Sequence, residues 1–124
     1  EEMKNVLIVE DSKAIRSVIR IALEEAGDFF AAEANNGFEA LRALPSRKFD
    51  LIITDINMPD INGLELVSFI RSNENYRTTP LVIISTEGSE RDREKGLALG
   101  ANAYLVKPFV PQQLQELVRK YLSC

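Results

Sequence analysis

The sequence predicts one α/β domain built on a five-stranded, mostly parallel, doubly wound sheet with five helices. Short apolar runs alternate along the chain with longer segments of helical periodicity, the pattern of βα units. Some of these runs are apolar without interruption, which is typical of strands buried on both faces. The length of 124 residues suits one domain with a core of its own. Right-handed crossovers between parallel strands then leave few topologies.

The first half of the chain predicts two strands and two helices. Residues 5–9 form a buried strand that ends at Glu10 and Asp11. Residues 29–34 form a weaker strand that is typical of a sheet edge. The intervening helix ends at Gly27 and carries one apolar face, made of Ile15, Val18, Ile19, Ala22, Leu23 and Ala26. The second helix ends at Pro45, and its capping box and short apolar face use Asn36, Glu39, Phe38, Leu41 and Leu44.

The second half predicts three further strands and three helices. Leu51 to Ile53 lead a buried strand to Asp55, and Pro59 then stops the run. Residues 80–85 and 103–106 are the remaining strands. The helix over 90–99 is highly charged with a thin apolar face, so we expect it to be marginally stable. The helices on either side of it carry apolar faces made of Leu64, Leu66, Val67 and Ile70, and of Leu114, Leu117, Val118 and Tyr121.

Composition excludes several classes of function. The net charge of −4 argues against direct nucleic-acid binding, and no apolar run approaches the roughly 20 residues of a membrane span. The single cysteine, Cys124, permits no intramolecular disulfide and favours a cytoplasmic protein. The chain has no histidine, which excludes Ser-His and Cys-His catalysis, His-ligated zinc and a phosphohistidine of its own. We assign residues 3–124 to the domain and leave Glu1 and Glu2, an addition or a native extension, outside it.

Polar side chains follow the predicted strands at their carboxyl ends. Glu10 and Asp11 follow the first strand, Asp55 the third, Ser85 the fourth and Lys107 the fifth. Open parallel sheets bind ligands at this edge, so these residues are expected to converge. Three carboxylates would repel one another, and a divalent cation with hard oxygen ligands, Mg²⁺, would relieve that repulsion.

A Mg²⁺ site of this kind is suited to a phosphoryl group. Mg²⁺ keeps water and phosphate oxygens in its shell, and aspartate is a known phosphoryl acceptor. Mg²⁺ and Lys107 would neutralise charge on the transferring group, and the Ser85 hydroxyl would bond one of its oxygens.

These residues resemble the receiver domain of the two-component response-regulator family, close to its stand-alone CheY-like members. The resemblance covers residues 3–122 and rests on Glu10-Asp11, Asp55 with Met58-Pro59 and Gly63, Ser85, Tyr104 and Lys107-Pro108. The strand order 2-1-3-4-5 is that of the family and comes from the resemblance alone. Met3 near the start and a last helix ending near Cys124 are consistent with a stand-alone protein.

The resemblance implies a role for each residue of the cluster. Asp55 is the phosphoacceptor, and Glu10, Asp11, Asp55 and the carbonyl of Asn57 hold Mg²⁺. Ser85 and Lys107 contact the phosphoryl group, Ser85 and Tyr104 form the switch, and the Lys107-Pro108 peptide is cis. The donor is a phosphorylated histidine on a sensor histidine kinase or phosphotransfer protein. Phosphorylation would draw Ser85 inward, let Tyr104 fill the space, and alter the surface of the fourth helix, fifth strand and last helix that an output protein binds.

Three further positions are expected to tune the phosphoryl lifetime. Asn57 and Glu87 flank the path of the attacking water, and Thr86 narrows access to Asp55. Taken singly, each residue of the cluster has an ordinary structural explanation, such as a turn, a helix cap or a solvated charge. Their coincidence at the strand ends of one sheet edge favours the functional interpretation.

Two alternatives belong to other functional classes. A Mg²⁺-dependent phosphohydrolase would need a second acid near the nucleophile and a substrate cap, whereas Asn57 stands two residues after Asp55 and no insertion is long enough for a cap. A phosphorylation-independent interaction module would not need the acidic pair, Ser85 and Lys107. The sequence therefore favours a signalling switch that catalyses only its own phosphorylation and dephosphorylation.

Overall fold

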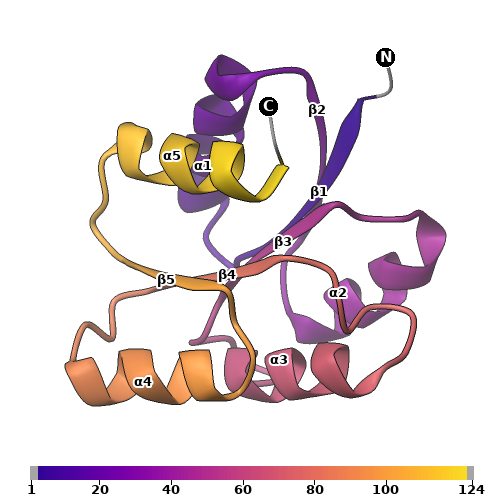
Figure 1. Ribbon diagram of the computed structural model, residues 1–124, viewed down its shortest axis with the longest axis vertical. Helices are drawn as coiled ribbons and strands as arrows, with labels where there is room; N and C mark the ends of the chain where they lie inside the picture. The colour runs from indigo at the N-terminus through magenta and orange to yellow at the C-terminus, as the bar shows by residue number, and fades with distance from the viewer. Residues whose placement is uncertain (1–2, 123–124) are drawn as a thin grey trace.

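The computed structural model describes residues 3–122 and confirms the predicted sheet (Figure 1). Its five strands lie in the order β2-β1-β3-β4-β5, and every neighbouring pair is parallel. The strands are β1 (Lys4–Val9), β2 (Phe29–Ala34), β3 (Leu51–Asp55), β4 (Leu81–Ser85) and β5 (Ala103–Val106). All strands therefore end at the same edge of the sheet.

Helices cover both faces of the sheet (Figure 1). Two helices, α1 (Lys13–Ala26) and α5 (Pro111–Leu122), lie side by side on one face. The other face carries α2 (Gly37–Ala43), α3 (Gly63–Ser72) and α4 (Glu90–Ala98). A short 3₁₀ turn, Leu44–Ser46, follows α2 and contains Pro45.

The central strands are apolar throughout because each faces two layers of helices. Along β1, Leu7 and Val9 pack in the core beneath α2 and α3, whereas Val6 and Ile8 pack in the core beneath α1 and α5. All residues of β3 and β4 are buried. The edge strand β2 has only one buried residue, Ala34, which agrees with its weak sequence signal.

The predicted helix boundaries agree closely with the observed ones, whereas two predicted core positions are wrong. Val18 of α1 is 46% exposed and Phe38 of α2 is 58% exposed, although periodicity placed both on buried faces. The predicted capping box is half formed: the Asn36 side chain accepts from the Glu39 N–H, but the Glu39 carboxylate accepts from the N–H of Asn35. The apolar stripe of a helix can be wider than the surface that covers it, and the sequence alone does not show where that cover ends.

The fourth helix is as thinly packed as predicted. Gly96 is its only fully buried residue. Gly100 follows α4 with a positive φ of 116°, the left-handed conformation that suits glycine after a helix. Cys124, on which the redox argument rests, lies outside the described residues. Within residues 3–122, every helix is too short or too polar to cross a bilayer.

Candidate functional site

The carboxyl ends of four strands bring the predicted polar residues together. Glu10 directly follows β1, Asp55 ends β3, Ser85 ends β4 and Lys107 directly follows β5. Sheet-like hydrogen bonds continue past two of these ends, because Glu10 N–H donates to Ala34 O at 3.0 Å and Lys107 N–H donates to Ser85 O at 2.8 Å. The backbones of these residues are thus fixed by the sheet itself.

Asp55 is buried, with only 5% of its surface exposed. Its Oδ1 accepts from the Ile56 N–H at 2.7 Å, and its Oδ2 lies 3.3 Å from Lys107 Nζ. Gly63 starts α3 against the same backbone, and a Cβ there would collide with Asp55 O and lie 2.6 Å from Ile56 Cα. Gly63 therefore allows α3 to begin directly against the backbone of Asp55 and Ile56.

Glu10 and Lys107 form an ion pair beside Asp55. Lys107 Nζ donates to Glu10 Oε1 at 2.7 Å, and the Ser12 N–H donates to Glu10 Oε2 at 3.0 Å. Burial raises the pKa of Glu10 above its usual 4.5, and the hydrogen bonds from Lys107 and Ser12 offset this only in part, because the negative charge of Asp55 adds to the rise.

The same carboxylates change the pKa of Lys107. Burial alone would lower the pKa of Lys107, but its hydrogen bond to Glu10 and the nearby charge of Asp55 outweigh burial, so the net pKa lies above the usual 10.5. A lysine held charged between two buried carboxylates is a fixed positive group at the strand ends.

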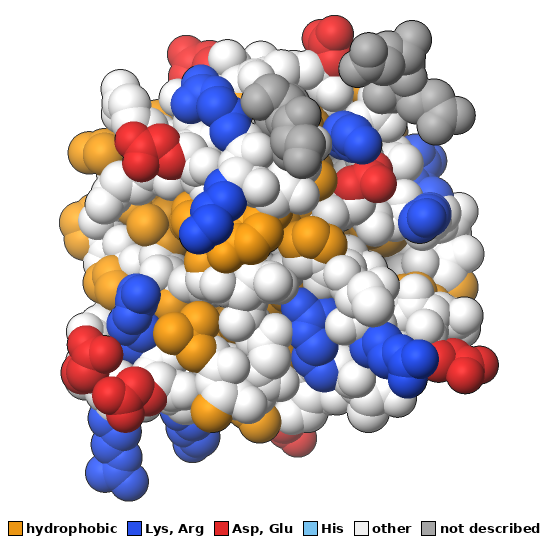
Figure 2. Space-filling model, viewed as in Figure 1, with side chains coloured by type: hydrophobic (Ala, Val, Ile, Leu, Met, Phe, Trp, Pro, Cys, Tyr) orange, Lys and Arg blue, Asp and Glu red, His pale blue; other side chains and the backbone are white. Residues whose placement is uncertain are grey.

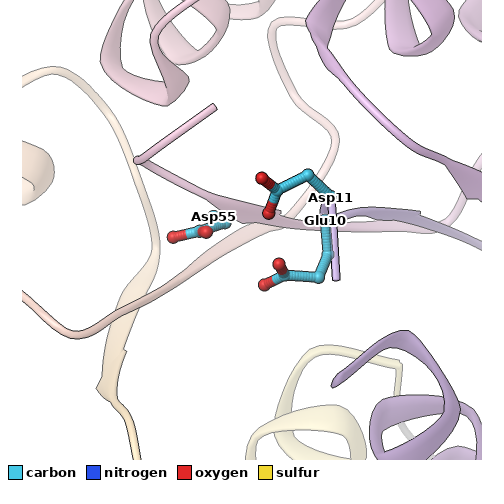
Figure 3. A group of neighbouring side chains, drawn as sticks. All are labelled: Glu10, Asp11 and Asp55. Carbon is cyan, nitrogen blue, oxygen red and sulfur yellow. The ribbon is translucent and has the colours of Figure 1, made fainter. Parts of the chain in front are cut away.

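Three carboxylates could hold a metal ion. Glu10, Asp11 and Asp55 each offer an oxygen, and these oxygens all lie within 4.8 Å of one another. Figure 3 shows the three side chains pointing toward the same side, beyond the strand ends. Two of them are buried and Asp11 is exposed, so the cluster opens to solvent. A set of oxygen donors without nitrogen or sulfur fits a hard cation such as Mg²⁺.

Ser85 and Tyr104 lie close to this cluster, and both side chains are hydrogen-bonded to the backbone of Glu87. Ser85 is fully buried, and its Oγ accepts from the Glu87 N–H at 3.0 Å. Tyr104 is also buried, and its hydroxyl donates to Glu87 O at 2.6 Å. A Cβ at Gly96 would lie 2.8 Å from Ile83 Cδ1 and 3.2 Å from the Tyr104 ring, so this glycine leaves room for both side chains beneath α4. Burial, together with nearby acidic charges, raises the pKa of Tyr104.

The predicted lifetime-tuning residues lie on the exposed rim. Asn57 Nδ2 donates to Glu87 Oε1 at 3.4 Å across the opening above Asp55. Thr86 is exposed and lines an apolar groove of about 460 Å³ together with Ile15, Val18, Lys107, Pro108 and Phe109. The Lys107-Pro108 peptide is cis, as the resemblance implied.

Two residues near the site escaped sequence reasoning. Arg16 Nη1 donates to Glu10 O at 2.6 Å and to Asn35 Oδ1 at 3.0 Å. The Asp60 carboxylate accepts from the N–H groups of Gly37 and Phe38. Both contacts join segments far apart in the chain, so no local pattern could have revealed them.

Comparison with known proteins adds independent information. The family model for the response regulator receiver domain matches residues 6–119. A chemotaxis protein CheY homolog of Campylobacter jejuni is 38% identical over 119 residues, which cover 95% of this chain and 92% of that protein.

Solved structures give the same fold. The chemotaxis response regulator CheY4 of Vibrio cholerae superposes with a TM-score of 0.88 at 38% identity, covering 97% of this chain and 99% of that one. The receiver domain of the sensor histidine kinase PA1611 from Pseudomonas aeruginosa, described with a magnesium ion coordinated in its active-site cleft, superposes with a TM-score of 0.87 at 28% identity. It covers 99% of this chain and 100% of that chain.

Proposed function

The chain belongs to the response regulator receiver domain family, and from this premise we propose that Asp55 is its phosphoacceptor in a Mg²⁺-dependent reaction. Receiver domains are the phosphoacceptor signalling switches of two-component systems, and they are not classical enzymes. The observation that carries the proposal is the convergence of Glu10, Asp11 and Lys107 on one buried aspartate.

The transfer is a simple displacement at phosphorus. An Asp55 carboxylate oxygen attacks the phosphoryl group of a phosphohistidine, the P–N bond breaks, and the imidazole leaves with the bonding electrons. Hydrolysis regenerates the free carboxylate: water attacks phosphorus, the P–O bond to Asp55 breaks, and inorganic phosphate is released. Lys107, 3.3 Å from Asp55 Oδ2, is placed to bond a phosphoryl oxygen.

Mg²⁺ would be held by Glu10, Asp11, Asp55 and the carbonyl of Asn57. When bound, it supplies positive charge that offsets the negative charge gathering on the phosphoryl oxygens. The compact cluster of carboxylate oxygens supports this ligand set. The magnesium ion named for the Pseudomonas aeruginosa receiver domain supports the choice of metal.

Ser85 and Tyr104 would couple Asp55 to the surface. In this structure Tyr104 occupies the inner position, with its hydroxyl on Glu87 O. Phosphorylation favours that position by drawing the Ser85 hydroxyl toward the phosphoryl group. Going from 1% to 99% of one state requires roughly 5.5 kcal/mol of differential stabilisation, which several charge-assisted hydrogen bonds can supply.

The face formed by α4, β5 and α5 would bind the output protein. Figure 2 shows this face with a band of hydrophobic side chains between α5 above and α4 below. Val106 of β5 is 39% exposed, and Tyr104 precedes it by two residues on the same strand. A change in the position of the Tyr104 side chain can therefore alter an exposed apolar surface that a partner would cover.

The remaining features complete the proposal. The donor is a sensor histidine kinase or a phosphotransfer protein, as membership of the receiver-domain family implies, and the absence of histidine from the chain is consistent with a donor on another protein. Asn57, Thr86 and Glu87 set the rate at which water reaches the phosphoryl group. The protein functions in the cytoplasm, without direct binding to nucleic acid or membrane.

Labelling with acetyl phosphate tests the proposal. We expect the unaltered chain to be phosphorylated in Mg²⁺ and not in EDTA, and Asp55→Asn to remain unlabelled. Asp50→Asn is the matched control, because Asp50 precedes the same strand at its other end. Labelling of Asp55→Asn at the normal rate would refute the assignment.

A second experiment tests the switch. Immobilised chain, labelled or unlabelled, is incubated with lysate, and the bound proteins are compared. We expect a protein retained only by the phosphorylated form, and Val106→Lys should lose it without losing phosphorylation. Identical bound proteins for both forms would refute a phosphorylation-dependent surface.

A further inference from the structure

We infer that Asp60 is a positioning residue, which ties the loop after Asp55 to the start of α2 and so holds the metal site in shape. The inference rests on the proposed function, since the site it shapes is the proposed Mg²⁺ site. It concerns residues 56–63, the loop that joins β3 to α3.

The Asp60 carboxylate bonds two backbone groups of a different element. Its Oδ1 accepts from the Gly37 N–H at 3.1 Å, and its Oδ2 accepts from the Phe38 N–H at 2.9 Å. Asn36 Oδ1 accepts from the next amide, Glu39 N–H, at 2.9 Å. The first amides of α2 are therefore capped jointly by a local residue and by the distant Asp60, and only the second of these also restrains the loop.

Close packing reinforces the hydrogen bonds. A Cβ at Gly37 would lie 2.6 Å from Ile61 Cβ and 3.3 Å from Ile61 O. The backbone of α2 thus touches the residue that follows Asp60, with no room for a side chain between them. The loop can move away from α2 only by losing this contact together with both hydrogen bonds.

The loop is fixed at its base as well as at Asp60. The Gly63 N–H donates to Ile56 O at 2.8 Å, which closes the loop beside Asp55. Between this closure and Asp60 lie only Asn57, Met58 and Pro59. The carbonyl of Asn57, the proposed metal ligand from this loop, is consequently held from both sides.

The start of α2 is also connected to the other acidic loop. Arg16 Nη1 bonds both Glu10 O, at 2.6 Å, and Asn35 Oδ1, at 3.0 Å. The Asn35 N–H in turn donates to Glu39 Oε1 of α2 at 2.6 Å. The two loops that carry the metal-binding groups are thus both linked by hydrogen bonds to the start of α2, and these bonds restrain the distance between the loops.

The charge state of Asp60 suits this role. Loss of some hydration acts to raise the pKa of the exposed Asp60, but the backbone N–H groups of Phe38, Ile61 and Gly37 outweigh it, and the net pKa lies below the usual 3.8. Asp60 is therefore ionised at neutral pH, as an acceptor of two N–H groups should be.

The test compares Asp60→Ala with Asn36→Ala in two measurements. Both variants remove a cap from α2, but only the first releases the loop. Hydrogen exchange of the Ile56 and Asn57 amides in metal-free protein reports the loop directly, and a Mg²⁺ titration followed by amide NMR gives Kd. We expect Asp60→Ala to speed exchange at both amides and to weaken Mg²⁺ binding by about tenfold, the low end of the range for groups that orient metal ligands.

The control variant Asn36→Ala should change neither measurement beyond about twofold, although it loses a helix cap of comparable stabilising free energy. Gly37→Ala keeps every hydrogen-bonding group and separates α2 from Ile61, so it should reproduce the effect of Asp60→Ala. Normal loop exchange and Mg²⁺ affinity in Asp60→Ala, or equal changes in Asn36→Ala, would overturn the inference while the proposed function stands. Absence of Mg²⁺ binding by the unaltered chain would overturn both.

Discussion

Replacing Lys107 with methionine removes the positive charge from the carboxylate cluster and retains most of the apolar stem. Glu10, 2% exposed, then loses its 2.7 Å partner and remains beside Asp55 and Asp11. A buried charge that loses one partner destabilises the fold, because its desolvation is no longer fully compensated. We therefore expect Lys107→Met to destabilise the metal-free protein at neutral pH.

The magnitude follows from the burial of the pair. Breaking a fully buried ion pair costs about 3–5 kcal/mol. The Lys107 side chain is 11% exposed and the cluster opens to solvent at Asp11, so we expect about 2–4 kcal/mol of lost unfolding free energy here. For a domain of this size each kcal/mol lowers Tm by roughly 3–5 °C.

Thermal and urea unfolding at pH 5 and pH 7, with and without Mg²⁺, measure the effect. The loss should be smaller at pH 5 than at pH 7, because removing the hydrogen bond from Lys107 raises the pKa of Glu10 further, and protonation of Glu10 removes the unpaired charge. Mg²⁺ should stabilise Lys107→Met more than the unaltered chain, since the lysine no longer repels the cation. Lys48→Met, at an exposed lysine in the loop before β3, is the control.

The reasoning is refuted by a loss that is equal at both pH values and is not reduced by Mg²⁺. Such a result would mean that Lys107 stabilises the fold through packing of its stem, and that the positive charge of Lys107 is not needed to stabilise the buried Glu10 carboxylate.

Three other predictions follow from neighbouring contacts. Because the pKa of Glu10 is raised, Glu10 stays protonated to a higher pH in the native protein than in the unfolded protein, whose pKa is the usual 4.5. The free energy of unfolding of the metal-free chain should therefore fall as pH rises above 4.5. Urea titrations of Glu10→Gln should no longer show that fall. Gly96→Ala should displace both Ile83 and the Tyr104 ring, so that the pKa of Tyr104 in a spectrophotometric titration moves back toward 10.0; an unmoved titration would show that Ile83 alone gives way. Thr86→Ala should widen access to Asp55 and change the rates of phosphorylation and dephosphorylation, and unchanged rates would exclude a role for Thr86.

The fold was predictable because its local signals agree with one another. The apolar runs of β1, β3 and β4 and the breaks at Gly27, Pro45 and Gly100 all indicate parallel strands between helices. Strand order is a long-range property and came only from the resemblance. Val18 and Phe38 show the limit of periodicity, which marks an apolar face but not whether another element covers it.

The candidate site was predictable to the extent that strand ends carry it. Glu10, Asp55, Ser85 and Lys107 converge because parallel strands share one carboxyl edge. The contacts of Asp60 with α2 and the space that Gly96 leaves for Tyr104 join distant segments. Such contacts depend on how helices settle on the sheet, and a single sequence does not encode them in any local pattern.

Locating the phosphorylated residue tests the central claim most directly. The chain is labelled with acetyl phosphate in Mg²⁺, the acyl phosphate is trapped by borohydride reduction, and tandem mass spectrometry identifies the modified residue. We predict modification at Asp55 alone, absent in EDTA. Modification at Glu10 or Asp11 in place of Asp55, or labelling that persists without Mg²⁺, would contradict the account.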